Sequence, residues 1–260
     1  MLTELQALIL GIIQGLTEFL PISSTGHLYI GRHMFGLDEA GIFLDAMLHI
    51  GTLLALLTVY KDELVKIIKN PFSRRSALLA VGTLPAVIAG ILLNDWFDNL
   101  SKTGSSIGWE FLVTGCILWW ADSARKGRKT LDEVTLKDAM IIGSFQAAAI
   151  MPALSRSGLT IASGLLCRLD RETAAYFSFL LSIPAISGGI LFQLKPVMMG
   201  QIEPISLSSL LTGTIAASIS GYLAVVWMIN FLKKRSLKIF SVYVWLLGAL
   251  ILWMQYSGKF

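Results

Sequence analysis

An apolar segment near the start of the chain contains Glu18-Phe19-Leu20-Pro21-Ile22-Ser23-Ser24-Thr25-Gly26-His27, and a later one contains Pro152-Ala153-Leu154-Ser155-Arg156-Ser157-Gly158-Leu159-Thr160. Charged and hydroxyl side chains at membrane depth are costly unless protein or a water-filled cavity surrounds them, so they are functional-site candidates. Both stretches also contain Pro and Gly, which interrupt helices. Each stretch therefore predicts a helix that stops inside the membrane, and together they predict one site built from two halves.

The composition of the whole chain is typical of a membrane protein. Of its 260 residues, 55% are hydrophobic and 15% are charged, whereas a soluble domain carries about 25% charged residues. Apolar segments long enough to span a membrane recur from one end to the other. The sequence predicts an all-α polytopic membrane protein in which residues 1–260 form a single integral-membrane domain.

Hydrophobicity and helix-breaking residues divide the chain into broken helical pairs and membrane spans. The broken pairs cover residues 4–34 and 137–167, around the two polar stretches. Six transmembrane helices are expected at residues 42–60, 76–94, 107–121, 174–194, 206–231 and 238–256.

Lys and Arg residues are distributed unevenly among the loops. Most of them follow the first span, the third span, the second broken pair and the fifth span, whereas each alternate loop holds one. Cytoplasmic loops are enriched in Lys and Arg, so the basic loops are placed in the cytoplasm. This assignment requires both broken pairs to be re-entrant hairpins, the first opening outward and the second inward. The basic residues therefore set topology, and we expect no nucleic-acid binding.

A weak internal repeat relates the two polar stretches. With residue 11 aligned to residue 143, the residues Gly11, Gln14, Ser23 and Gly26 fall on Gly143, Gln146, Ser155 and Gly158. The first repeat is expected at about residues 1–121 and the second at about 122–260. Inverted repeats with broken helices are typical of transporters. This keeps open the hypothesis of a polyprenyl-phosphate lipid transporter or flippase.

The first polar stretch offers ligands and a nucleophile. Gln14 and Glu18 are four residues apart on one helix face, and both carry oxygens suited to a divalent cation. The alternative is a buried Glu18 that only bonds a neighbouring helix. Ser24 and His27 are three apart at a helix start, which suits a nucleophile with a nearby base. Equally, Ser24 could cap the helix and His27 could be a satisfied buried residue.

The second polar stretch offers a cation for an anionic group. Guanidinium groups bind phosphate bidentately, so Arg156 with the hydroxyls of Ser155 and Ser157 forms a candidate phosphate cradle. The alternative is a structural pair between Arg156 and Glu18. An unpaired Arg at this depth is so costly that one anion or the other must lie near it.

A further polar pair lies at the outer end of the first span. Asp45 and His49 are four residues apart, so they share a helix face. They could support His27 or Glu18 from behind, or form an ordinary pair at the membrane surface.

At these residues the chain resembles the undecaprenyl-pyrophosphate phosphatase family, also known for bacitracin resistance. Residues 14–27 resemble its first motif, (E/Q)xxxE followed by PxSSTGH, and residues 155–160 resemble its PGxSRSxxT motif. The segment 45–52 is also similar to a family segment. Two positions depart from the usual pattern, with Gln14 in place of a common Glu and Ala153 in place of a Gly.

The resemblance implies hydrolysis of undecaprenyl pyrophosphate to the monophosphate and inorganic phosphate, which recycles the carrier lipid for cell-wall synthesis. It implies a multi-pass protein of the bacterial cytoplasmic membrane whose active site opens to the periplasmic face. The expected partners are a polyprenyl pyrophosphate lipid and the bilayer. Whether the chain forms a homodimer is left open.

The resemblance also implies residue roles. Gln14 and Glu18 would hold a divalent cation, Mg²⁺ or Ca²⁺, or tune the base. Ser24 would be the nucleophile, His27 the proton-transfer group and Arg156 the phosphate clamp, although direct attack by His27 or by water stays open. The substrate-binding residues that it implies are Ser23, Thr25, Gly26, Ser155, Ser157, Gly158 and Thr160.

Overall fold

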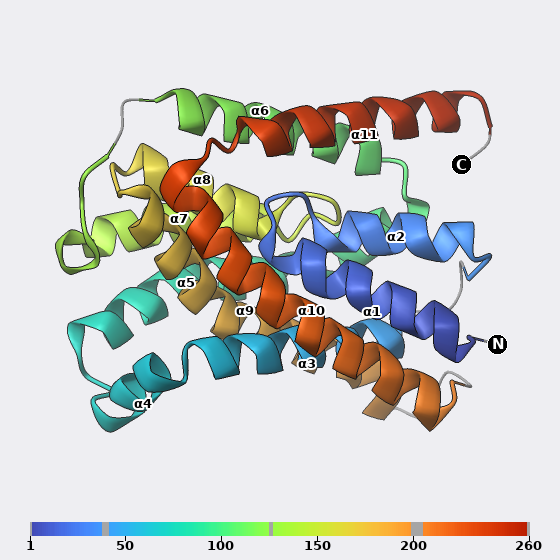
Figure 1. Ribbon diagram of the computed structural model, residues 1–260, viewed down its shortest axis with the longest axis horizontal. Coiled ribbons are helices and arrows are strands. Elements are labelled where there is room, and N and C mark those ends of the chain that lie inside the picture. Colours follow the sequence, from blue (N-terminus) through green and yellow to red (C-terminus); the bar gives the residue numbers. More distant parts are fainter. Residues whose placement is uncertain (1, 38–41, 125–126, 199–204, 259–260) are drawn as a thin grey trace.

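The computed structural model describes residues 2–37, 42–124, 127–198 and 205–258 (Figure 1). Within these residues the chain is helical and forms no β-strand beyond an isolated bridge between Lys129 and Leu169. The predicted all-α class is confirmed. The helices are, in chain order, α1 (Glu4–Phe19), α2 (Ser24–Met34), α3 (Ile42–Val59), α4 (Lys61–Lys69), α5 (Arg74–Thr103), α6 (Ile107–Ser123), the short 3-10 helix η1 (Leu131–Glu133), α7 (Leu136–Ala148), α8 (Arg156–Leu166), α9 (Arg171–Met198), α10 (Leu207–Lys234) and α11 (Lys238–Tyr256).

Several of the described helices are long and apolar enough to cross a membrane. Four pass by themselves: α5 over Arg74–Leu93, α9 over Arg171–Leu194, α10 and α11. A fifth span exists if α3 and α4, which are bent by 79°, count as one. With 17 residues, α6 is at the short end for a span. The protein is a multi-pass membrane protein, and the six-span arrangement stays a prediction.

Both polar stretches coincide with helix breaks, as predicted. α1 ends before Pro21, because the residue preceding a proline is restricted to an extended conformation, with ψ of 147° here. Ser23 then caps α2 by accepting a hydrogen bond from the backbone N–H of Gly26 (3.3 Å). Ser155 caps α8 in the same way, accepting from the N–H of Gly158 (3.0 Å). The two hairpins therefore share one local construction.

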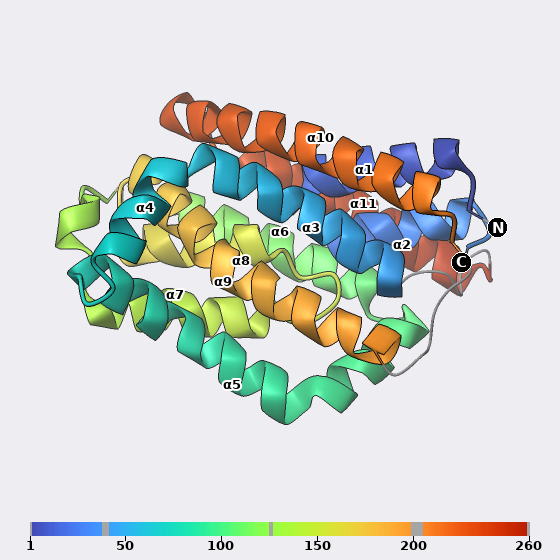
Figure 2. The ribbon, with the colours of Figure 1, turned by 90° about the horizontal axis from the view of Figure 1, so that it is seen from below.

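Close packing of small residues positions the hairpins. α1 packs on α10, and α7 packs on α5 (Figures 1 and 2). A Cβ added at Gly11 would lie 2.3 Å from the carbonyl oxygen of Gly213, and one at Gly143 would lie 2.1 Å from that of Gly82. Only glycine permits these backbones to approach so closely.

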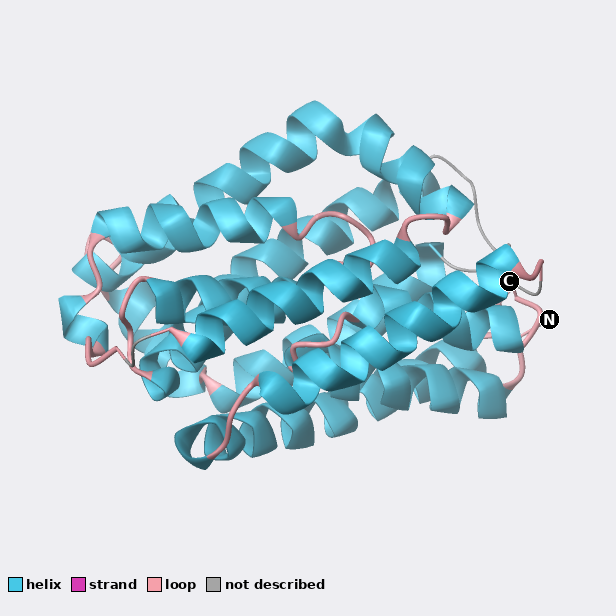
Figure 3. Cartoon of the chain, turned by 90° about the horizontal axis from the view of Figure 1, so that it is seen from above, coloured by secondary structure: helices cyan, strands magenta, loops and turns pink. Residues whose placement is uncertain are grey.

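The two breaks meet inside the helical body. The hydroxyl of Ser157 donates a hydrogen bond to the carbonyl oxygen of Leu20 (2.8 Å), which joins α8 directly to the break after α1. Loop segments accordingly lie within the body of the molecule as well as at its two ends (Figure 3). The arrangement brings two sequence-distant polar stretches to one place.

Candidate active site

Glu18 is the centre of the polar cluster at the two breaks. Its side chain is 6% exposed. One carboxylate oxygen accepts from the guanidinium of Arg156, and the other accepts from Gln14 Nε2 (3.0 Å) and Ser24 Oγ (2.5 Å). His49 Nε2 lies 3.9 Å from the second oxygen. The buried negative charge is thus compensated by a cation and two hydrogen-bond donors, as burial of a charge requires.

The contact between Ser24 and Glu18 has a chemical consequence. A hydroxyl becomes a better nucleophile when an adjacent base can take its proton. Glu18 already accepts the Ser24 hydrogen bond at 2.5 Å, so it is within proton-transfer distance of Oγ. The geometry therefore pairs Ser24 with a carboxylate base.

A cavity of about 380 Å³ opens beside this cluster. Glu18, Ser24, His49 and Arg156 line it together with residues of α5, α7 and α9. Arg156 Nη1 is buried and has no hydrogen-bond partner. A buried donor left unpaired costs about 1–3 kcal/mol, so this nitrogen is suited to an anionic ligand in the cavity.

Gln146 contributes a second set of unpaired atoms to the same cavity. Its side chain is on α7, the residue is 2% exposed, and neither its Nε2 nor its Oε1 has a partner. Buried polar atoms are normally satisfied, so a buried amide with both ends unpaired is suited to bind a polar ligand in the cavity. The sequence contains one signal for this residue, because the internal repeat aligns it with Gln14.

His27 lies outside the cavity. Its Nδ1 is 2.6 Å from the carbonyl oxygen of Ser23, and its Nε2 is 2.8 Å from Tyr243 Oη. The ring packs between Phe111, at 5.5 Å and edge-to-face, and Tyr243, at 5.7 Å and stacked. The structure does not bring His27 to Ser24 as a base. It places His27 where it holds the backbone carbonyl of the residue that precedes Ser24.

The other hydroxyls divide into those that face the cavity and those that support it. Ser23, Thr25, Ser155 and Ser157 line the cavity, and Thr25 is exposed there. Thr160 lies behind them, where its hydroxyl is 2.6 Å from Ser178 Oγ on α9. Its role in the structure is to fix α8 against α9.

The two predicted glycines are packing positions. A Cβ at Gly26 would lie 2.6 Å from the ring of Phe111, and one at Gly158 would lie 2.9 Å from the side chain of Ser155. Neither residue lines the cavity. They allow the two breaks to pack closely, and they lie away from any molecule bound in the cavity.

Asp45 and His49, expected either to support His27 or Glu18 or to form a surface pair, have side chains with different partners. Asp45 accepts from Arg32 Nη1 (2.6 Å), which fixes it to α2. His49 points to the cavity, with its Nδ1 2.7 Å from the carbonyl oxygen of Asp45. His49 is therefore the imidazole nearest to Glu18, a place that the sequence could not distinguish from that of His27.

The donors available for a metal ion are few. Among the residues that the structure describes, no group of three or more His, Cys, Asp or Glu side chains is placed to hold one. Gln14 Oε1 is buried and unpaired, and it belongs to the same side chain whose Nε2 donates to Glu18. Mg²⁺ commonly uses one or two protein ligands plus substrate phosphates. Gln14 and Glu18 fit that kind of site.

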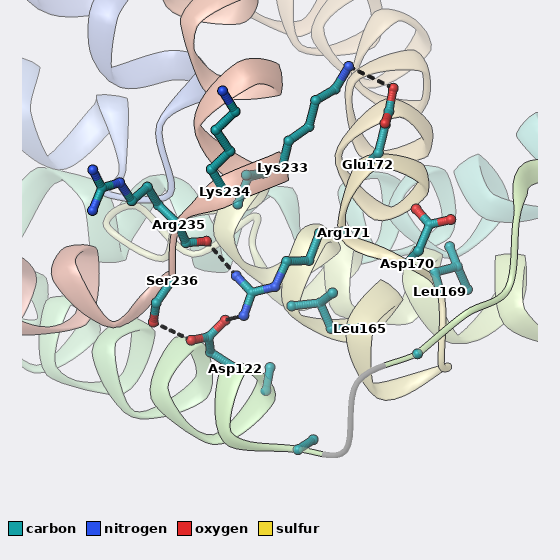
Figure 4. A pocket seen from close by; sticks show the side chains of 14 residues that line it. Asp122, Leu165, Leu169, Asp170, Arg171, Glu172, Lys233, Lys234, Arg235 and Ser236 are labelled. Carbon is teal, nitrogen blue, oxygen red and sulfur yellow. Dashed lines mark hydrogen bonds and ion pairs between the residues drawn. The ribbon is translucent and has the colours of Figure 1, made fainter.

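A larger cavity, of about 700 Å³, lies elsewhere, where the ends of α6 and α10 meet the start of α9 (Figure 4). Several of its charged groups are paired with each other. Arg171 donates to Asp122 (2.5 Å), which also accepts from Ser236, and Lys233 is 3.0 Å from Glu172. These pairs tie three helix ends together, which gives the charged groups of this cavity a structural role.

Comparison with known proteins agrees with the residues at the breaks. Residues 7–250 match the family described as bacitracin resistance protein BacA. The chain belongs to this family. Undecaprenyl-diphosphatase 4 of a Bacillus cereus strain is 63% identical over 98% of this chain and 99% of its own length.

More distant members of the BacA family also match over nearly their full length. The undecaprenyl-diphosphatase of Carboxydothermus hydrogenoformans is 46% identical over 100% of both chains. That of Alkaliphilus metalliredigens is 38% identical over 96% of this chain and 98% of its own. The resemblance inferred from the sequence motifs is confirmed.

Proposed function

We propose that this protein is an undecaprenyl-diphosphatase, an integral-membrane hydrolase that converts undecaprenyl diphosphate to undecaprenyl phosphate and inorganic phosphate. The observation that carries the proposal is the hydrogen bond from Ser24 to Glu18 beside the unpaired nitrogen of Arg156. A nucleophile, a base and a phosphate-binding cation thus line one cavity. The names of the BacA-family relatives state the same activity for those proteins.

The residues support a covalent mechanism. Arg156 Nη1 and Gln146 Nε2 bind oxygens of the terminal phosphate, and Ser24 and Thr25, the first residues of α2, bring their backbone N–H groups to the same cavity. Ser24 Oγ attacks the terminal phosphorus while Glu18 takes the hydroxyl proton. The bond between this phosphorus and the bridging oxygen breaks, and undecaprenyl phosphate leaves. A water oxygen then bonds to the phosphorus of the phosphoserine, the bond from phosphorus to Ser24 Oγ breaks, and Oγ recovers its proton from Glu18 as phosphate leaves.

His27 enters this scheme as a positioning residue. By binding the carbonyl of Ser23 it holds the backbone from which Ser24 projects. Ser23 has a φ of 70°, a conformation that is unfavourable for a residue with a side chain. The contact from His27 helps to stabilise this conformation at the break.

A divalent cation is proposed as the cofactor. When bound, it would neutralise negative charge on the diphosphate oxygens. Gln14 and Glu18 would hold it together with the substrate. Each of the protein's own steps, which are phosphate binding by Arg156 and proton removal by Glu18, uses groups already in place.

The membrane arrangement proposed is six spans plus two re-entrant hairpins in an inverted repeat, in the bacterial cytoplasmic membrane, with the site opening to the periplasmic face. Helix packing supports the repeat, because a contact that a helix of one half makes with the other half has a counterpart in which the two halves change places. α1 contacts α10 as α7 contacts α5, and α3 contacts α10 as α9 contacts α5. The uneven distribution of basic residues supports the sidedness. A homodimer stays a prediction.

The test is phosphate release from undecaprenyl diphosphate by purified protein in detergent, with and without a chelator. Wild type should release phosphate, and rapid quenching should trap a phosphoserine at Ser24. Turnover without any trapped phosphoserine, together with a nearly normal rate in Ser24→Ala, would assign the attack to water.

A polyprenyl-phosphate lipid transporter is the second candidate, and the exchange of helix contacts between halves favours it. Transport of a labelled polyprenyl phosphate across vesicles by a protein that releases no phosphate would replace the enzymatic proposal. Phosphate release without transport would eliminate the second candidate.

A further inference from the structure

A second, apolar cavity continues from the active-site cavity. It has a volume of about 430 Å³ and lies between α4, α5 and α9. Thr83, Val87 and Pro184 line both cavities. The two cavities are therefore neighbours, the first next to Glu18 and Arg156 and the second extending toward α4. In Figure 2, α5 runs along the edge of the molecule with α4 at one end.

The walls of this second cavity suit a hydrocarbon chain. Among the described residues that line it, Thr83 alone has a polar side chain, and that hydroxyl already donates to the carbonyl oxygen of Leu79 (2.7 Å). The remaining wall is built from aliphatic side chains and Pro184. Ala80, Leu84 and Val87 follow one another on a single face of α5, at spacings of four and three residues. Nothing in this wall offers a free hydrogen bond to a polar ligand.

The two cavities are also open toward the surrounding lipid. Of the four helices that qualify as spans among the described residues, α5 is the least buried, with 11% of its apolar window inside the protein. Leu84 is 48% exposed and Val87 is 46% exposed. On the facing helix, a Cβ added at Gly188 or Gly189 would meet nothing within 4 Å. This contrasts with the tightly packed glycines of α1 and α7.

We infer that the polyprenyl chain of the substrate leaves the active-site cavity sideways between α5 and α9. It then lies in the second, apolar cavity, which we call the groove, and runs toward α4. The inference rests on the proposed function and names where its lipid substrate binds. A lipid from the outer leaflet has its head toward the outside and its chain toward the membrane centre. With the basic α4 on the cytoplasmic side, the groove runs in that same direction from Glu18.

The test compares two substrates in a variant that fills the groove. Leu84→Trp replaces an aliphatic side chain of the groove with a larger aromatic one. Leu250→Trp on α11 is the matched control, because Leu250 is 49% exposed and Leu84 is 48% exposed. Leu84→Trp should raise KM for undecaprenyl diphosphate about tenfold, because contacts of the chain with apolar surface are lost. KM for isopentenyl diphosphate, which carries only a five-carbon group, should be unchanged. Equal effects on both substrates, or no effect on either, would overturn the inference.

A second measurement does not depend on turnover. A polyprenyl diphosphate with a photoreactive group near the end of its chain should cross-link to peptides of α5 and α9 that include Ala80 and Ile183. Ala80→Trp should reduce this cross-link and Leu250→Trp should not. Labelling confined to other helices would refute the route even if the protein hydrolyses the lipid. Correct labelling without phosphate release would refute the proposed function and leave the route standing.

Discussion

The two hairpins share their backbone construction and differ in charge. In each, a serine caps the second helix by accepting from a glycine N–H three residues later. The first hairpin carries Glu18 at its break and the second carries Arg156. Neither charge is tolerable at this depth alone, and each becomes tolerable through the other. In the proposed mechanism, one scaffold is thus used twice, to hold a base and to hold a phosphate-binding cation.

The hairpins differ again in how their glutamines are satisfied. Gln14 donates to Glu18 within α1, whereas Gln146 has no partner for either amide atom. Arg156 likewise keeps one nitrogen free. Within the first hairpin, Gln14 and Ser24 both donate to one oxygen of Glu18, whereas the second hairpin keeps unpaired donors on Arg156 and Gln146. We therefore expect residues of the first hairpin to contribute mainly to the chemical step and residues of the second to contribute mainly to substrate affinity.

The largest expected effect is in the first hairpin. Ser24→Ala should lower kcat by at least about 10⁴-fold, because removal of a nucleophile eliminates the covalent route. Ser163→Ala in the second hairpin is the control, since Ser163 donates to the carbonyl oxygen of Thr160 (3.1 Å), away from the cavity. Phosphate release measures both. Comparable rates for the two variants would contradict the assignment of chemistry to the first hairpin.

Arg156→Ala should have the second-largest effect, a loss of roughly 10³-fold in kcat/KM, because the phosphate-binding group is removed. It should also destabilise the protein by about 3 kcal/mol, because Glu18 is left buried without its cation. Thermal unfolding in detergent reports this second effect. Glu18→Gln combined with Arg156→Ala should restore stability without restoring activity. If the double variant is no more stable than Arg156→Ala, the charges do not compensate each other.

His27 should give an intermediate effect. His27→Leu removes the contact to the Ser23 carbonyl and should lower kcat about tenfold to a hundredfold by misplacing Ser24. His27→Asn, which can still donate to that carbonyl, should recover most of the rate. The pH dependence of kcat should keep its shape in both. A pH limb that disappears in His27→Asn would instead make His27 a proton-transfer group.

A smaller effect separates the two glutamines. Gln146→Leu should raise KM for the lipid about tenfold through loss of a hydrogen bond to phosphate, with kcat little changed. Thermal stability should stay equal or increase, because a buried unpaired amide is removed. Gln14→Leu should instead lower kcat, since it disturbs Glu18. Identical kinetic changes in the two variants would contradict the assignment of the base to the first hairpin and of substrate affinity to the second.

The smallest effect concerns the cofactor. Gln14→Glu adds a carboxylate next to Glu18 and should lower the Mg²⁺ concentration for half-maximal activity several-fold, because Mg²⁺ favours carboxylate oxygens. A Mg²⁺ titration of phosphate release after chelator treatment measures it. An unchanged midpoint would remove Gln14 from the proposed metal site.

The class of the protein, the places where its helices break and the residues near those breaks could all be predicted from the sequence. Hydrophobic length, proline restriction and serine capping act over a few neighbouring residues, so they can be read along the chain. It also named Glu18, Ser24 and Arg156, whose cost at membrane depth marks them without a structure.

Which of these residues come together in space depends on how the helices pack. The contact between Arg156 and Glu18 joins residues 138 positions apart, and close glycine packing of α1 on α10 and of α7 on α5 sets it. The tertiary structure also brings His27 to Tyr243 of α11, places His49 and Gln146 at the cavity, and forms the groove between α5 and α9. Side-chain direction depends on how helices rotate against one another, and spacing along one helix does not contain that information.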